Sequence, residues 1–281
     1  MFDVYSDMPP EVWQSLPVLV VVWCFAACWG SFLNVCIYRI PMELSVVAPG
    51  SHCFSCKKAV AWYDNIPVLS WFILRGKCRH CGAGFSIRYA LVEALTATLF
   101  LAVWMRYGPS WITLAYWLMC FGLLLGSGVD LDEMWIPDRV TKGGMILGIP
   151  LSALLPELHG EVIWHQGLLA SALGAAAGFG SLWAVGKIGT WLFKKDAMGF
   201  GDVKLMGALG AFLGAPAILY IVFVAALLGS IVGVTLIACG NKELGGRIPF
   251  GPYLSVAAVS WIFGGEGLLN WYLDLFRLPV L

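Results

Sequence analysis

The sequence predicts an all-α polytopic membrane protein of about eight transmembrane helices, with a zinc-knuckle cytoplasmic loop between helices 1 and 2. Composition carries the membrane assignment. Of the 281 residues, 60% are hydrophobic and 12% are charged, and the mean hydropathy is +0.82, whereas about a quarter of the residues of a typical soluble domain are charged. Two Cys-x-x-Cys pairs in one polar loop predict the knuckle.

Eight apolar runs divide the chain. Runs of about 20 residues with few charges are typical of membrane-spanning helices, and we place them at 17–38, 88–105, 110–129, 140–156, 166–193, 203–214, 216–239 and 252–276. The run at 203–214 is short, so whether it fully spans the membrane stays open. A half-helix, or a tilted helix in a thinned bilayer, also fits its length.

Lysine and arginine gather on one side of the predicted bundle. The odd-numbered connections hold 15 of the 17 basic residues, and only Arg106 and Arg277 fall on the other side. Because cytoplasmic loops are enriched in Lys and Arg, the N-terminus is expected outside the cytoplasm. Residues 1–16 contain acids but no Lys or Arg, which favours a retained signal anchor over a cleaved signal peptide. The net charge is zero, and we expect no nucleic-acid partner.

Four cysteines share the first basic connection, which we take as residues 39–87. They form two Cys-x-x-Cys turns, and two such turns supply four thiolates for tetrahedral zinc: Cys53, Cys56, Cys78 and Cys81. A disulfide framework competes, but the loop is predicted to face the reducing cytoplasm. A closed four-sulfur site would be structural and would staple the loop. His52 and His80 lie beside the cysteines, and exchange of one cysteine for a histidine ligand stays open.

Acidic side chains at the ends of two apolar runs are candidates for chemistry, because charge is costly in a membrane. The segment "GVDLDEMWIPD" (128–138) places Asp130 at the end of the third run, and "AMGFGDVKLMG" (197–207) places Asp202 after two nearby glycines. Two aspartates from different helices can form an acid-protease pair, in which one carboxyl keeps a proton and the other activates water. We see no Ser/His/Asp grouping, no HExxH and no Gly-rich phosphate loop.

Small residues support an approach of the two acid-bearing helices. Gly122-x-x-x-Gly126 and Gly210-x-x-x-Gly214 lie on those runs, and this spacing allows close helix contact. The spacing also occurs without acids, at Gly174/Gly178 and Gly229/Gly233. The GxxxG spacing therefore gives only moderate support for contact between the two acid-bearing helices.

The other acids of the segment 128–138 are expected to have structural roles. Asp132 lies roughly 200° around the helix from Asp130 if the helix continues, and Asp132 and Glu133 are expected to be solvated or to cap a helix. Asp138 follows Pro137, a context that predicts the start of the fourth helix.

Seven segments, in order, resemble the type IV prepilin leader peptidases, which are membrane aspartyl proteases with a GxGD motif. The segments are "SFLNVCIYRIP" (31–41), "SHCFSC" (51–56), "WYDNIPVLSWFILRGKCRHC" (62–81), "RYALVEALT" (88–96), "VDLDEMWIPD" (129–138), "GFGDVKL" (199–205) and "IPFGPYL" (248–254). The resemblance covers nearly the whole chain. It departs from the family pattern at Phe54, Ala90 and Val129, and none of these three residues takes part in the proposed chemistry.

The resemblance implies a bacterial inner-membrane, multi-pass prepilin peptidase that is also an N-methyltransferase. Such enzymes cut the basic leader from type IV prepilins or type II secretion pseudopilins, whose following helix is apolar and lies in the lipid, and then methylate the new N-terminus with S-adenosylmethionine. The resemblance implies that Asp130 and Asp202 are catalytic, and that Cys53, Cys56, Cys78 and Cys81 are the cysteine tetrad. Gly76 matches a glycine that the family associates with methyl transfer.

This interpretation implies three parts: a first transmembrane helix at 1–38, the zinc-binding loop at 39–87 and a membrane-embedded aspartyl peptidase domain at 88–281. The alternative is a non-enzymatic membrane transporter or assembly scaffold, whose acids carry protons and whose zinc loop docks a partner. Transporters often contain two matching halves with interrupted helices, and we see no such internal repeat. The sequence leaves open the substrates, the S-adenosylmethionine site, the oligomeric state and which aspartate is the acid.

Overall fold

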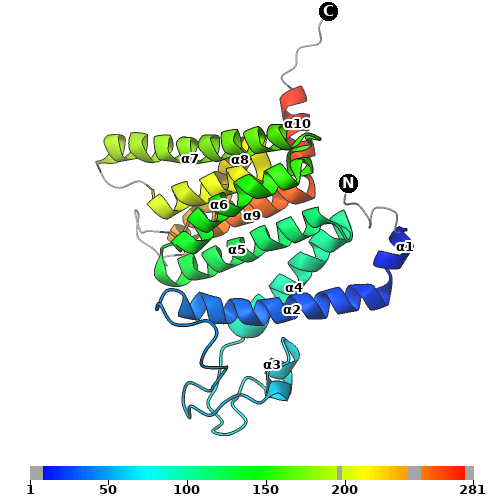
Figure 1. Cartoon of the computed structure of the whole chain (residues 1–281). Coiled ribbons are helices and arrows are strands. Elements are labelled where there is room, and N and C mark those ends of the chain that lie inside the picture. Colours follow the sequence, from blue (N-terminus) through cyan, green and yellow to red (C-terminus); the bar gives the residue numbers. More distant parts are fainter. Residues whose placement is uncertain (1–8, 195–197, 240–247, 276–281) are drawn as a thin grey trace, which may run out of the picture. The chain divides into compact units, whose positions relative to one another are not determined.

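We describe the fold from a computed structural model, which places residues 9–194, 198–239 and 248–275. Over these residues the chain forms helices and no β-strand, with two isolated β-bridges in the cysteine loop. The chain divides into two compact units, Met1–Leu125 and Gly126–Leu281. Figure 1 labels the helices.

The first unit contains two long helices that pack on each other, and the cysteine loop connects them. Its elements are α1 (Pro10–Trp13), α2 (Leu16–Arg39), the 3₁₀ turn η1 (Trp62–Asp64), α3 (Leu69–Ile73), α4 (Arg88–Tyr107) and the beginning of α5 (Trp111–Glu133). At the crossing of α2 and α4, Gly30 faces the backbone of Glu93 so closely that a Cβ at position 30 would lie 2.7 Å from the Glu93 Cα. This contact fixes Glu93 against α2.

Aromatic side chains join the beginning of α5 to α4. The Trp117 ring stacks on Phe100 with a centroid distance of 5.2 Å, and Trp117 Nε1 donates a hydrogen bond of 2.8 Å to the Phe100 carbonyl oxygen. The indole N–H, which would be costly to leave unpaired in an apolar setting, is thereby satisfied.

The second unit is a helical bundle in which α8 contacts α6, α7 and α9. Its elements after the end of α5 are α6 (Asp138–Leu154), the 3₁₀ turn η2 (Pro156–His159), α7 (Trp164–Phe193), α8 (Phe200–Ala238), α9 (Gly251–Ser260), the π turn η3 (Trp261–Gly265) and α10 (Glu266–Asp274). In Figure 1, α6, α7 and α8 lie alongside one another. The first half of α8 is buried almost throughout.

Glycines bring α7 and α8 into backbone contact. A Cβ at Gly174 would collide with the Gly210 carbonyl, and a Cβ at Gly178 would collide with the Met206 carbonyl. Gly210 therefore packs on the backbone of α7, whereas its spacing had suggested an approach to α5. Gly126 of α5 instead faces the side chains of Ile136 and Val140, which follow it in the chain.

α8 contains a break at Gly214, which has φ 79° and ψ 172° and is followed by Pro216. The break lies between the predicted runs 203–214 and 216–239, so both runs belong to one interrupted helix. By length and composition, five described helices could each cross a membrane: Leu16–Arg39, Arg88–Tyr107, Trp111–Glu133, Trp164–Leu192 and Phe200–Ala238. The helical fold class is confirmed, whereas the count of eight crossings stays a prediction.

Candidate active site and cysteine cluster

Asp130 is a buried carboxylate in the last turn of α5, with 5% of its surface exposed. Its Oδ2 accepts a hydrogen bond of 2.9 Å from the backbone N–H of Gly251. Gly251 is the first residue of α9, and the first N–H groups of a helix have no partner within the helix. The helix start thus supplies a donor to the carboxylate.

Asp202 lies in the first turn of α8 and is also buried. The helix begins after Gly199, and a Cβ at position 199 would lie 2.8 Å from Asp202 Oδ2. Glycine therefore leaves room for the carboxyl group to fold over the helix start. Asp202 Oδ1 is buried and has no hydrogen-bond partner among the described residues. A buried carboxyl oxygen without a partner is costly, and such a group is expected to meet a ligand, water or substrate.

Ile136 connects the segments that carry the two aspartates. A Cβ added to Gly201 would lie 3.4 Å from the backbone N and the Cβ of Ile136. A Cβ added to Gly251 would lie 3.1 Å from the Cδ1 of Ile136. Asp130 and Asp202 are also near enough to interact electrostatically. The structure thus brings together three of the quoted segments, 129–138, 199–205 and 248–254.

The remaining acids of 128–138 face outward. Asp132 and Glu133 are exposed, as the helical periodicity predicts. Asp138 is the first residue of α6, and its carboxylate pairs with Lys142 at 2.7 Å and with Lys204 at 2.6 Å. These two lysines lower the pKa of Asp138 to about 2. The predicted helix start at Asp138 is confirmed, and this acid belongs to an exposed ion-pair cluster.

The two Cys-x-x-Cys turns of the loop have the same backbone hydrogen bonds. The N–H of Cys53 donates to the carbonyl of Lys58, and the N–H of Cys78 donates to the carbonyl of Ala83. In the reverse direction, the N–H groups of Lys57 and Gly82 donate to the carbonyls of Cys53 and Cys78. The β-bridges His52–Ala59 and Lys77–Gly84 close the two turns at equivalent positions.

The two turns bring all four thiols together. The sulfur atoms of Cys53, Cys56, Cys78 and Cys81 lie within 4.8 Å of one another, and those of Cys53 and Cys81 are 3.7 Å apart. This group could hold one metal ion, and it is made of the four cysteines without a histidine.

Hydrogen bonds and desolvation give the thiols of the cluster different pKa values. The backbone N–H groups of Cys56 and Ser55 lower the pKa of the Cys53 thiol to about 6. The backbone N–H of Ala83 acts in the same direction on Cys81, but desolvation and hydrogen bonds with the other thiols outweigh it and raise the pKa of Cys81 to about 11. A lowered thiol pKa favours the thiolate, which is the form that binds metal.

Gly76 shapes the turn that precedes Cys78. It has φ +66°, its N–H donates to the Trp71 carbonyl, and its own carbonyl accepts from the N–H of Phe85. A Cβ at this position would lie 3.2 Å from atoms of the Trp71 indole. Gly76 therefore supports the position of Trp71.

Two contributors to the site were missed at the level of sequence. The segment "IPFGPYL" was recognised as a motif, but its Gly251 was not assigned to Asp130, and Ile136 was not singled out. A glycine followed by proline before an apolar run indicates a helix start with free N–H donors. That signal identifies Gly251 as a donor, although it does not identify the acceptor.

Comparison with known families gives two matches that together span most of the chain. Residues 24–107 match the bacterial Peptidase A24 N-terminal domain, and residues 117–234 match the Type IV leader peptidase family. The first match contains the cysteine cluster, and the second contains both Asp130 and Asp202.

Several curated relatives carry the name prepilin leader peptidase/N-methyltransferase. The relative from Aeromonas hydrophila is 36% identical over 296 residues, which cover 95% of this chain and 98% of the relative. The relative from Myxococcus xanthus is 38% identical, covering 85% of this chain and 68% of the relative. The relative from Neisseria gonorrhoeae is 33% identical, covering 87% and 91%. No solved structure matches this chain.

Proposed function

The chain belongs to the type IV leader peptidase family, and from this membership we propose that it cleaves the basic leader from type IV prepilins or type II secretion pseudopilins. We further propose that it N-methylates the new N-terminal residue with S-adenosylmethionine. The relatives' shared name supports both halves. The substrates would be chains with a basic leader followed by an apolar helix that lies in the lipid.

The catalytic pair of this proposal is Asp130 and Asp202. Both are buried and they interact electrostatically, and two close carboxyl groups cannot both ionise readily, so the pair would share one proton. The ionised carboxylate takes a proton from a water molecule, whose oxygen attacks the scissile carbonyl. The protonated carboxyl hydrogen-bonds the carbonyl oxygen and then supplies the proton that the leaving amine needs.

One observation carries the assignment: Asp202 Oδ1 is a buried carboxyl oxygen that lacks a partner among the described residues, within electrostatic range of Asp130. Gly251 holds the other carboxylate through Oδ2. One acid is thus positioned by the protein, and the other has an oxygen available for water or substrate.

We propose that this pair faces the cytoplasmic boundary of the bacterial inner membrane, with the N-terminus of the chain outside. The positions of Lys and Arg support this orientation. A basic leader stays on the same side by the same rule, so its scissile bond would lie at the boundary where α5 ends and α8 begins.

We propose zinc as the metal of the cysteine cluster. Four thiolates are the donor set that structural zinc prefers, and two sulfurs bound at about 2.3 Å in a tetrahedron lie roughly 3.8 Å apart. The 3.7 Å between the Cys53 and Cys81 sulfurs fits this geometry. With all four positions filled by cysteine, the ion would staple the loop and leave no position for a reacting water.

S-adenosylmethionine supplies the methyl group in the second proposed reaction. In a direct transfer, the amine nitrogen would bond to the methyl carbon while the carbon–sulfur bond breaks, its electron pair would go to sulfur, and the amine would release a proton. The chain would hold the donor close to the new N-terminus.

The test of the peptidase proposal is leader cleavage by purified variants in detergent, read as the loss of the leader mass from a prepilin. Asp130→Asn and Asp202→Asn keep the side-chain shape but remove the titratable carboxyl, so each should abolish cleavage at normal protein levels. Full activity of either well-folded variant would disprove the catalytic pair.

A further inference from the structure

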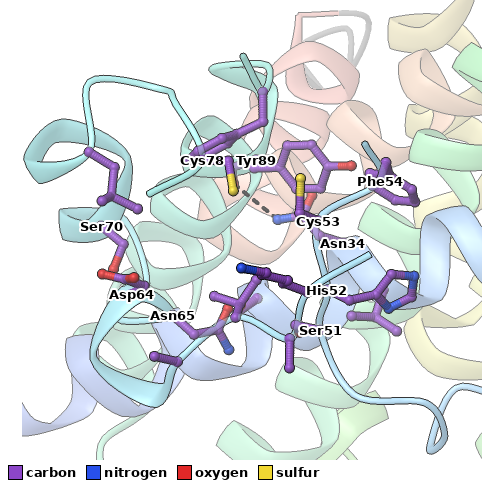
Figure 2. Close-up of a pocket in the computed structure, with 18 of the residues that line it drawn as sticks. Asn34, Ser51, His52, Cys53, Phe54, Asp64, Asn65, Ser70, Cys78 and Tyr89 are labelled. Atoms are coloured by element: carbon purple, nitrogen blue, oxygen red, sulfur yellow. Dashed lines mark hydrogen bonds between the residues drawn. The ribbon is translucent and has the colours of Figure 1, made fainter. Parts of the chain in front are cut away.

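A cavity of about 690 Å³ lies in the first unit, between the cysteine loop and the neighbouring ends of α2 and α4. Figure 2 shows it with Asn34 of α2 and Tyr89 of α4, together with Cys53 and Cys78 from the two knuckle turns. The Asn34 side-chain amide donates a hydrogen bond of 3.0 Å to the Tyr89 carbonyl and so ties the two helices together at the cavity.

We propose that this cavity binds the methyl donor, S-adenosylmethionine, an inference that rests on the methyltransferase half of the proposed function. The donor combines an adenine ring, ribose hydroxyls, a sulfonium cation and a zwitterionic amino acid end. Pockets of roughly 300–1,000 Å³ hold ligands of this size, with mostly apolar walls and a few placed polar groups. The cavity meets these requirements in its size, its unpaired hydroxyl, its charges and its aromatic walls.

The unpaired hydroxyl belongs to Ser70 of α3. Ser70 is more than nine-tenths buried and lines the cavity, and its Oγ has no hydrogen-bond partner among the described residues. A buried hydroxyl without a partner is costly in a folded protein. A ligand with hydroxyl or amine groups would satisfy it.

The charges of the wall fit a ligand that is both cationic and zwitterionic. Glu93 is a half-buried carboxylate on α4, and its Oε2 accepts a hydrogen bond of 2.6 Å from the Val68 N–H. Ser31 also hydrogen-bonds this carboxyl group, and the sulfonium or the amino group of the donor would be its partner in the ligand. The lysines of the lining, Lys57 and Lys58, suit the donor's carboxylate. The two arginines of the lining already have partners, because Arg39 donates to the carbonyls of Ser45 and Pro49 and Arg79 pairs with Asp64.

Aromatic side chains supply surfaces for the adenine ring. Four that line the cavity are Tyr38, Phe54, Trp71 and Tyr89. Tyr38 and Phe54 are already in edge contact, with their centroids 5.2 Å apart, and Trp71 is fixed by its Nε1 hydrogen bond to the Phe85 carbonyl. A planar ligand can stack on such prearranged rings at low entropic cost.

Gly76 acquires a role in this arrangement as a positioning residue. Gly76 does not line the cavity, but it faces the indole of Trp71, and Trp71 does line the cavity. The knuckle also forms part of the wall through Cys53 and Cys78. The structural metal would therefore shape the methyl-donor pocket.

The experiment measures the affinity of the zinc-loaded full chain in detergent for S-adenosylmethionine and S-adenosylhomocysteine by calorimetry. Glu93→Gln keeps an oxygen for the Val68 N–H and removes the charge, so we expect at least about tenfold weaker binding of S-adenosylmethionine. Ser70→Ala removes a hydroxyl that lacks a partner, so we expect about fivefold weaker binding with no loss of stability. The control is Glu43→Gln, the same charge change at an exposed loop position outside the lining, which should bind like wild type.

Methyl transfer to a cleaved prepilin by the wild-type chain is measured in parallel. It distinguishes failure of the cavity assignment from failure of the methyltransferase function. If the wild type transfers methyl groups while both lining variants bind the donor normally, the cavity assignment is wrong and the proposed function stands. If the wild type transfers none and binds no donor, the methyltransferase function fails and the cavity assignment fails with it. Loss of a co-purified phospholipid from the variants, with unchanged donor affinity, would assign the cavity to lipid and overturn the proposal.

Discussion

The backbone N–H of Gly251 donates a hydrogen bond of 2.9 Å to Oδ2 of Asp130, although the two residues are 121 positions apart in the chain. This bond joins the end of α5 to the start of α9. It gives one proposed catalytic acid an N–H donor, whereas the buried Oδ1 of the other acid, Asp202, has no partner among the described residues.

Gly251→Ala should damage leader cleavage without unfolding the chain. The added Cβ would lie 2.8 Å from Asp130 Oδ2 and 3.1 Å from Ile136 Cδ1, so the carboxylate must move. Because displacement of a reacting group by about 1 Å can cost about 100-fold in rate, we expect cleavage to fall by about 10- to 100-fold. The matched control is Gly143→Ala, also near a helix start, where a Cβ meets nothing within 4 Å. Equal cleavage by the two variants would show that Asp130 tolerates displacement.

Asp138→Asn should retain cleavage within about fivefold of wild type, because exposed ion pairs contribute little. The pKa of Asp138 is depressed to about 2 by Lys142 and Lys204. A depressed folded-state pKa contributes stability above the unfolded value of about 4, and this contribution is lost as the pH falls toward 2. Thermal unfolding of the two proteins should therefore differ slightly at pH 5–7 and converge as the pH falls below about 4. An inactive, well-folded Asp138→Asn protein would move the catalytic assignment to Asp138.

Zinc should be present at about one ion per chain and should depend on the four clustered thiols. Replacing Cys53 and Cys56 with serine removes half of the donors, so zinc content should fall and protease should cut the loop of residues 39–87 faster. Cys239→Ser is the control, because that thiol lies at the end of α8 and outside the cluster. Elemental analysis and limited proteolysis measure both effects. Full zinc retention by the double variant would exclude these cysteines as ligands.

Gly76→Ala should impair methylation more than cleavage. Both Gly76 (φ +66°) and Gly82 (φ +70°) have a backbone conformation that costs a non-glycine residue roughly 1–2 kcal/mol. The two positions differ in their surroundings. A Cβ added to Gly76 would lie 3.2 Å from atoms of the Trp71 indole, whereas a Cβ added to Gly82 would meet nothing within 4 Å. We expect methyl incorporation to fall about tenfold or more in Gly76→Ala, with smaller effects in Gly82→Ala.

Leader removal, measured on the same samples, separates a local effect on methyl transfer from general misfolding, and zinc content confirms that the knuckle is intact. If Gly76→Ala and Gly82→Ala lose methylation equally, strain in the loop would be sufficient to explain the loss, and the contact with Trp71 would have no special role.

The sequence alone determined the features that depend on neighbouring residues. Helical periodicity distinguished Asp130 from Asp132, and the structure has the first buried and the second exposed. Proline at position 137 predicted that a helix begins at Asp138, where α6 does begin. The three-residue spacing within each Cys-x-x-Cys pair predicted two metal-binding turns, because a short turn fixes both thiols of a pair locally.

Tertiary structure decided which distant segments meet. The GxxxG spacing identified Gly210 as a contact residue, but its partner proved to be Gly174 of α7, since the same small-residue pattern fits several helices equally well. The hydrogen bond from the Gly251 N–H to Asp130 and the position of Ile136 between the segments likewise depend on long-range packing. So does the burial of the Ser70 hydroxyl, which has no partner among the described residues. Periodicity states which face of a helix is buried, whereas the shape of the opposing surfaces determines what that face contacts.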